Sequence, residues 1–392
     1  MTQNSNQSAL NRLFPSANLD KVFDHKRKGR VAVLESPPRK DNNYRKSSVY
    51  KRGSGLSSKN KAIGVVLKTP EVMIKVDHLS SGIKTVAQLK QNAEYISRNG
   101  NLEVEDQDGN KLDRAELKDL MYGWSLDQDI PEDKSELTTK RTADARRIVI
   151  SCPKECDPEK VIASARQFGR EFFAENGFDY VFVAHIHDPE HPKEPDHPHV
   201  HFMVKTLNCL EQRLYITQVD LQFMRERFAA IAREHGLSLN ATSRAVRGNT
   251  SRSKSSERYY LEQTTDVKPT YQQKHDQEIA EALRQGKPLP DCEPIKQAKI
   301  TRTRVLDAAK EAVEELRQST DERDHVLASE LEKHFETLEP VQSIHEKRYN
   351  AAKALITQRQ QEREKQQERK LKDKGRDIGG NKQQQVTQDL EI

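Results

Sequence analysis

The sequence concentrates its histidines in one short segment. Six of the thirteen histidines lie within residues 185–201. Alternate residues of a β-strand point to the same face, so His199 and His201 share a face, and His185 and His187 would share one on the preceding run. Three imidazoles that converge can hold one divalent cation and leave positions open for substrate oxygens and water. We therefore predict a catalytic metal site rather than a loop of solvated histidines or a structural metal clip.

The ligand set is expected to contain His199 and His201, because they flank a hydrophobic residue in a run that continues as an apolar strand. The third ligand is either His185 or His187, and the spacing alone leaves both open. Asp196 is predicted to orient one of the histidines through a hydrogen bond rather than to bind the metal itself.

The elements that must position these histidines are strands interleaved with helices. Runs of high strand propensity predict strands at residues 71–76, 147–151, 180–187 and 199–205, of which the last two form an antiparallel pair. Asp108-Gly109 predicts the turn of a hairpin. Apolar faces at helical spacing predict helices from the cap Thr85 to Asn99, at residues 161–173 and at residues 221–231. This pattern is typical of an α+β fold.

Apolar and charged residues are distributed unevenly along the chain. Only 34% of the residues are hydrophobic and 32% are charged, so we expect a packed core in only part of the chain. We predict four regions: a basic, largely disordered arm at residues 1–69, a folded domain at 70–265, a charged helical region at 266–357, and a polar, disordered or frayed tail at 358–392.

Neither a membrane anchor nor a disulfide framework is indicated. No segment approaches the roughly 20 consecutive apolar residues of a membrane span, and the N-terminus has no apolar stretch typical of a secretion signal. The four cysteines are sparse and lack the spacing of a disulfide scaffold. We therefore expect a cytoplasmic protein without membrane insertion.

Three collinear segments resemble the motifs of one enzyme family. They are residues 91–103, which contain Tyr95, residues 196–201, which contain the paired histidines, and residues 240–248, Asn-Ala-Thr-Ser-Arg-Ala-Val-Arg-Gly. In this order they resemble motifs of MOBP-type conjugative relaxases, which belong to the HUH endonuclease superfamily and include the T-DNA border nickases. The similarity covers about residues 70–260, so the domain at 70–265 is predicted to be a relaxase catalytic domain.

The resemblance implies a central antiparallel sheet that carries the histidines and a flanking helix that carries a nucleophilic tyrosine. Tyr95 matches that tyrosine. Without the motif, the more common interpretation of Tyr95 would be a half-buried helix residue beside Ile96. His185 matches the third histidine when residues 188–195 are counted as an insertion, with His187 as the alternative.

Further roles follow from the same resemblance. Asp196 and His197 match residues just before the histidine pair and are assigned supporting catalytic roles. The implied reaction is an attack of the tyrosine on a phosphodiester, which leaves a 5′-phosphotyrosine adduct that can later be religated without ATP. Mg²⁺ or Mn²⁺ is the expected ion for this chemistry, with Zn²⁺ or Ni²⁺ as alternatives for three imidazole ligands.

The expected partner is single-stranded DNA at a transfer origin. Positive side chains would contact its phosphates in a salt-sensitive manner, and the candidates are Arg98, Arg244, Arg247 and Arg252. Because the sequence has no phosphate-binding loop of a helicase, a separate helicase is expected. Relaxosome accessory proteins and a type IV secretion coupling protein are further expected partners, with translocation to a recipient cell alongside the DNA.

Two other functions compete with this interpretation. A rolling-circle replication initiator would place its tyrosine after the histidines, where Tyr259 and Tyr260 lie. Neighbouring positions on a helix point about 100° apart, so both could not face one site. A non-catalytic DNA-binding accessory protein would use the histidines for a structural metal. The order of the motifs favours the relaxase with Tyr95.

Overall fold

The computed structural model describes residues 8–15, 30–32, 57–77, 82–137, 141–186, 196–216, 218–249, 261, 264 and 270–388. The chain divides into two compact units. Unit 1 contains Met1–Arg247 and Leu306–Thr337, and unit 2 contains Gly248–Val305 and Leu338–Ile392.

The centre of unit 1 is an antiparallel sheet to which six of the described strands contribute. Its order is β2-β5-β7-β6-β3-β4. The strands are β2 (Met73–Val76), β3 (Val104–Asp106), β4 (Lys111–Leu112), β5 (Ala145–Ser151), β6 (Tyr180–His185) and β7 (His199–Lys205). A small second sheet pairs β1 (Arg30–Ala32) with β8 (Arg213–Tyr215) in parallel. The predicted α+β fold with a central antiparallel sheet is confirmed.

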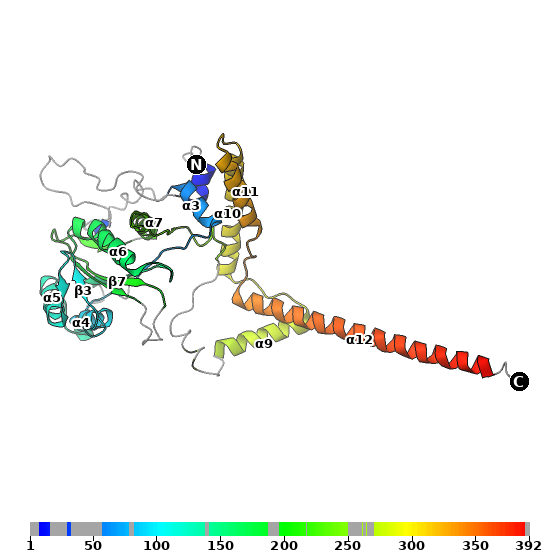
Figure 1. Cartoon of the computed structure of the whole chain (residues 1–392). Coiled ribbons are helices and arrows are strands. Elements are labelled where there is room, and N and C mark those ends of the chain that lie inside the picture. Colours follow the sequence, from blue (N-terminus) through cyan, green and yellow to red (C-terminus); the bar gives the residue numbers. More distant parts are fainter. Residues whose placement is uncertain are drawn as a thin grey trace. The chain divides into compact units, whose positions relative to one another are not determined.

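Helices cover both faces of the six-stranded sheet. The helices α6 (Pro158–Phe172) and α7 (Gln218–Glu234) pack on one face, and α4 (Val86–Ile96) and α5 (Arg114–Asp127) on the other (Figure 1). Strand β7 is buried along its whole length, because it lies in the middle of the sheet between two helical layers. Its alternating side chains divide between the two cores: Val200, Phe202 and Val204 face α6 and α7, whereas Met203 faces α4 and α5.

Local signals in the sequence fix the ends of several elements. The Thr85 hydroxyl accepts a hydrogen bond from the Gln88 amide and caps α4. Beyond the end of that helix the backbone turns left-handed, with φ of 58° at Asn99 and 87° at Gly100. The predicted hairpin joins β3 to β4, and its Gly109 has a φ of 87°. Short 3₁₀ turns occur at η1 (Lys134–Glu136) and η2 (Ala174–Asn176).

The N-terminal segment differs from the predicted disordered arm where the structure describes it. Two helices lie within residues 1–69, α1 (Ala9–Leu13) and α3 (Ser58–Val66). They pack in unit 1 together with α11 (Glu322–Glu336) and the C-terminal part of α10 (Glu293–Arg317). The structure thus places two short helices in a segment that was predicted to be largely disordered. Each helix is too short to show an apolar period and is stabilised by burial against distant elements. The rest of the predicted arm lies largely outside the described residues.

The C-terminal half of the chain is helical, as predicted. Besides α10 and α11 it contains α9 (Thr270–Gln285) and α12 (Ile344–Gln388), and α12 runs through the predicted boundary at residue 358. Residues 306–337 belong to unit 1 rather than to a separate helical region. No helix in the part of the chain that the structure describes is long and apolar enough to cross a membrane. All four cysteines are free thiols.

Candidate metal centre and nucleophile

Three histidines meet where β6 ends and β7 begins. His185 is the register partner of His199, and His201 lies two residues further along β7 on the same face. The ring centroids are 5.0 Å apart for His185 and His199, 4.4 Å for His185 and His201, and 5.1 Å for His199 and His201. One ring nitrogen from each lies within 4.8 Å of the others. We call these three residues the histidine triad. His187, the alternative third ligand, lies outside the described residues.

Two backbone carbonyls fix the orientation of two of these rings. His185 Nε2 lies 2.7 Å from the Ile96 carbonyl oxygen, and His199 Nδ1 lies 3.1 Å from the His197 carbonyl oxygen. A carbonyl only accepts, so each of these nitrogens carries the proton. The lone pair then belongs to Nδ1 of His185 and to Nε2 of His199. This division of roles is the one that a metal-ligating imidazole needs.

The triad is buried, and one of its members, His201, is uncharged at neutral pH. The three side chains are 6–8% exposed. Burial, together with the neighbouring His185 and His199, lowers the pKa of His201 to about 3. A neutral imidazole is the form that binds a metal, so His201 needs no deprotonation at neutral pH. The three residues therefore fit a divalent metal ion.

Tyr95 lies beside the triad in the last turn of α4. Its ring meets His201 edge-on, with the ring centroids 5.9 Å apart. The side chain is 60% exposed, although the neighbouring Ile96 is fully buried. Because the Ile96 carbonyl accepts from His185, the end of α4 is tied to the triad through the residue after Tyr95. The helix thus holds an accessible phenol next to the buried imidazoles.

The two supporting residues before the histidine pair make different contacts. Asp196 accepts a hydrogen bond from Lys154 Nζ at 2.9 Å, and both side chains are more than half exposed. The His197 ring lies 5.6 Å from the His199 ring, but its contribution to the orientation of His199 comes from its backbone carbonyl. A main-chain group thus provides an orienting contact for His199, and the supporting role of Asp196 stays a prediction.

Two arginines add positive charge near the triad. Arg98, one of the predicted DNA contacts, and Arg147 on β5 both contribute to the lowered pKa of His201. Arg98 has a left-handed backbone with a φ of 49°. Arg147 was not singled out from the sequence, because its place beside His201 depends on the pairing of β5 with β7. In that pairing Arg147 is the register partner of Met203 and so shares the sheet face of His201.

The third motif, residues 240–248, has a more structural role than expected. The Asn240 side chain is fully buried and its Nδ2 donates to the Lys61 carbonyl of α3. A side chain at Gly64 would collide with it, since a Cβ there would lie 2.3 Å from Asn240 Nδ2. Glu71 accepts from the Thr242 amide at 2.7 Å and also from its hydroxyl. The motif therefore anchors α3 and the residues before β2.

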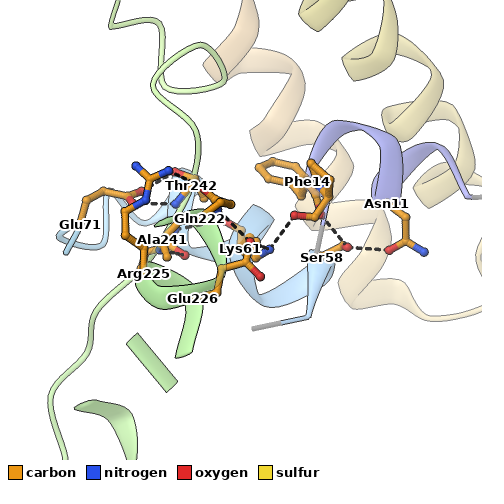
Figure 2. A network of polar contacts seen from close by, with 12 residues as sticks. Asn11, Phe14, Ser58, Lys61, Glu71, Gln222, Arg225, Glu226, Ala241 and Thr242 are labelled. Atoms are coloured by element: carbon orange, nitrogen blue, oxygen red, sulfur yellow. Dashed lines mark hydrogen bonds and ion pairs between the residues drawn. The ribbon is translucent and has the colours of Figure 1, made fainter. Parts of the chain in front are cut away.

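Polar contacts between α3 and α7 extend this network, as Figure 2 shows. Lys61 Nζ lies 2.7 Å from Glu226 Oε1, and both side chains are nearly inaccessible to solvent. Burial lowers the pKa of Lys61, against the opposing effect of Glu226. Because each charge is removed from water, each depends on the other. These residues were not singled out from the sequence, where Lys61 looks like one more residue of a solvated basic run.

The other predicted DNA contacts occupy different environments. Arg244 is exposed. Arg247 is half-buried, and its Nε lies 3.5 Å from Glu71 Oε1. Arg252 lies outside the described residues, as do Tyr259 and Tyr260, the tyrosines of the rolling-circle alternative.

Residues 104–237 match the family model of the relaxase, MobA/VirD2-like, nuclease domain. This segment, about a third of the chain, is therefore similar to the MobA/VirD2-like relaxase nuclease domain. It contains the whole histidine triad, whereas Tyr95 precedes the matched residues. The resemblance to relaxases is thereby confirmed.

Three curated proteins similar to the chain share one description. The T-DNA border endonuclease VirD2 of Rhizobium radiobacter is 29% identical over 181 residues, which cover 43% of this chain and 41% of that protein. The T-DNA border endonuclease VirD2 of Agrobacterium fabrum is 28% identical over 191 residues, or 44% and 39% of the two chains. The same protein of Rhizobium rhizogenes is 28% identical over 187 residues, or 43% and 39%. The aligned segment of this chain thus spans about two fifths of the length of these relatives.

Proposed function

We propose that the protein is a relaxase that nicks one DNA strand at the transfer origin of a plasmid or other mobile element, with Tyr95 as the nucleophile. One observation carries the proposal: an exposed phenol lies edge-on to His201 of a buried triad of imidazoles, with the ring centroids 5.9 Å apart. An ordinary core tyrosine would be buried, and a surface tyrosine would have no reason to lie beside three potential metal ligands.

The proposed reaction is a transesterification. The Tyr95 oxygen loses its proton and attacks the phosphorus of the scissile phosphodiester, while the bond from phosphorus to the 3′ oxygen breaks and that oxygen takes up a proton. The product is a 5′-phosphotyrosine ester and a free 3′ hydroxyl. Because the ester retains the energy of the broken bond, a 3′ hydroxyl can attack it later and religate the strand.

His185, His199 and His201 are the residues that would hold the cation. When bound, a divalent ion supplies Lewis-acid stabilisation of the negative charge that develops on the phosphate oxygens. The carbonyls of Ile96 and His197 keep two of the rings in the orientation that ligation needs. The expected ion is Mg²⁺ or Mn²⁺, with Zn²⁺ or Ni²⁺ as alternatives.

Single-stranded DNA would approach the site along positive side chains. Arg98 and Arg147 lie close enough to His201 to affect its pKa, so they would also attract a phosphate at that position. Arg244, Arg247 and Arg252 would contact phosphates further along the strand. The similarity to VirD2, a T-DNA border endonuclease, supports a DNA substrate.

The wider role we propose is conjugative DNA transfer. In it the protein acts in the cytoplasm with accessory DNA-binding proteins and a separate helicase, and a type IV secretion coupling protein receives it with the attached strand. The charged C-terminal helices are the proposed docking segment for that coupling protein. Unchanged DNA transfer after deletion of the residues following Gln358 would argue against this assignment.

The nucleophile can be tested with single-stranded oligonucleotides that carry candidate origin sequences, in the presence of Mg²⁺ or Mn²⁺. We expect the full chain to cut one oligonucleotide and become attached to its 5′ side, and Tyr95→Phe to lose both activities. Tyr122→Phe is the matched control, because Tyr122 is 56% exposed on the neighbouring helix α5.

Other outcomes would favour the alternatives. If Tyr95→Phe still cleaves DNA, another residue is the nucleophile, and Tyr259 and Tyr260 are the first candidates. If the wild-type chain bound origin DNA but never cut it, the non-catalytic accessory protein would be the better description.

A further inference from the structure

A second cluster of potential metal ligands lies in unit 2, away from the histidine triad in the sequence. It consists of His275 and Glu278 on α9 and His345 at the start of α12. One donor atom from each residue lies within 4.8 Å of the others. His345 Nε2 is 3.6 Å from a carboxylate oxygen of Glu278, and the two imidazole rings stack with their centroids 4.4 Å apart.

The packing of α9 on α12 brings these three side chains together. His275 and Glu278 are three residues apart, so they project from the same face of α9. Ile279 and Tyr349 are buried on the two helices, and Arg348 forms an ion pair with Asp276. His345 Nε2 also lies 3.2 Å from the His275 carbonyl oxygen, and a metal bound at Nε2 would replace this hydrogen bond, because a carbonyl only accepts. The cluster is therefore held by contacts on both helices rather than formed by one exposed side chain.

We propose that His275, Glu278 and His345 bind a zinc ion that joins α9 to α12. Two imidazoles and one carboxylate form a donor set that zinc accepts in a tetrahedral site, with water in the fourth position. Tetrahedral coordination needs donor atoms about 3.3 Å apart, so donors that lie within 4.8 Å of one another have to move closer by up to about 1.5 Å. The proposal requires the partly exposed histidines and the exposed Glu278 to rotate by this amount.

Unit 2 has a small hydrophobic core, so a bound ion would add to its stability. Among its described residues only three apolar side chains are buried: Ile279, Val341 and Tyr349. A unit with so small a core buries little apolar surface and gains stability from a metal or another cross-link. Because zinc would bind the packed helices and not the separated ones, its binding free energy would add to the stability of the α9–α12 pair.

The simplest competing explanation is an ion pair between protonated His345 and Glu278. Glu278 has a side-chain exposure of 60%, so solvent would screen such a pair and it would add little stability. It would also need no metal. Zinc titration therefore separates the two explanations.

The test uses the full chain without a purification tag and a chromophoric zinc chelator as competitor. In a background with His199→Asn and His201→Asn, which removes the triad, we expect one zinc ion per chain. Adding Glu278→Gln or His345→Ala should weaken its binding at least about 10-fold. His345→Cys should retain zinc, since a thiolate is also a zinc ligand. His325→Ala, an exposed histidine on α11, is the matched control and should change nothing.

Circular dichroism of each variant checks its folding, and Glu278→Gln tests the proposal even if a histidine variant unfolds, because Glu278 is largely exposed. A second measurement compares the zinc content of the wild-type chain with that of Glu278→Gln. We expect the variant to bind one zinc ion fewer per chain. A background that binds no zinc, or affinities that Glu278→Gln and His345→Ala leave unchanged, would overturn the proposal. None of these measurements uses DNA cleavage, so this proposal can fail while the proposed nickase activity stands.

Discussion

The histidine triad of the sheet and the His275–Glu278–His345 cluster of the helices both gather three potential ligands, but they are built differently. The triad residues are 6–8% exposed and lie on strands whose register is set by neighbours on both sides. In the helical cluster Glu278 is largely exposed, and the contact rests on the packing of α9 against α12. Burial and fixed register suit a site that must hold reacting charge in place, whereas an exposed cluster suits a site that only joins two elements.

The surroundings of the histidine triad and of the helical cluster also differ. The triad shares its sheet face with the hydrophobic core under α4 and α5, and main-chain carbonyls orient two of its rings. A rigid environment of this kind lowers the cost of reorganisation during a reaction. Among the described residues of unit 2, which holds the helical cluster, three apolar side chains are buried. We therefore expect substitutions in the two regions to affect different properties.

The largest effect is expected for the triad. His201→Asn should lower the rate of oligonucleotide cleavage about 10³-fold or more, because a cation contributes several kcal/mol to stabilising the charge on the phosphate. Single-turnover cleavage with a saturating metal ion measures this effect. His345→Ala, which removes a histidine of the other cluster, should leave the rate within about twofold. Equal losses in both variants would remove the functional distinction between the clusters.

A large effect on stability is expected at the buried pair of Lys61 and Glu226. Lys61→Met leaves Glu226 buried without its partner and should destabilise unit 1 by about 3–5 kcal/mol, as measured by urea unfolding. The double variant Lys61→Met/Glu226→Leu should recover most of this loss. The exposed pair of Arg114 and Glu94 is the control, and Arg114→Ala should cost less than about 1 kcal/mol. A small effect of Lys61→Met would mean that α3 is not an integral part of unit 1.

A smaller effect is expected on DNA affinity. Arg98→Gln should weaken the binding of single-stranded DNA several-fold and reduce the salt dependence of log K by about 0.7, the value for one lost phosphate contact. Fluorescence anisotropy at several salt concentrations measures both quantities. Arg284, which is 76% exposed on α9, provides the comparison, and Arg284→Gln should change neither. An unchanged salt slope for Arg98→Gln would exclude a phosphate contact at this residue.

The smallest effect on cleavage is expected for a substitution in the helical cluster. Glu278→Gln should leave cleavage within about twofold of the wild type, because the proposed zinc ion of unit 2 takes no part in the reaction. The same variant should lose the stabilisation that zinc gives to thermal unfolding. Cleavage that depends on Glu278 as strongly as on His201 would show that the two clusters act in one reaction.

Features that depend on nearby residues could be predicted from the sequence. The Thr85 cap, the left-handed end of α4 at Asn99 and Gly100, and the turn at Asp108-Gly109 are all local signals, and the structure confirms them. The antiparallel pairing of the two histidine strands followed from their composition and from the short connection between them. These are interactions whose partners are visible within a short window of sequence.

Features that depend on distant residues could not be predicted. Lys61 looked solvated because its partner Glu226 lies on another helix far along the chain. His275 and His345 are 70 residues apart and each resembles an ordinary residue of a polar helix. The charge of Arg147 near the triad depends on a strand order that the sequence does not display. In each case a tertiary contact decides the role, and no local preference indicates it.

The most direct measurement is to map the amino acid that carries DNA after cleavage. The full chain is incubated with its cleaved oligonucleotide and the metal ion, digested with a protease, and the peptide that retains the nucleotide is sequenced by mass spectrometry. We predict a phosphodiester on Tyr95, in a peptide from α4 that ends beside the histidine triad. A nucleotide found on Tyr259, Tyr260 or any other residue would contradict the account.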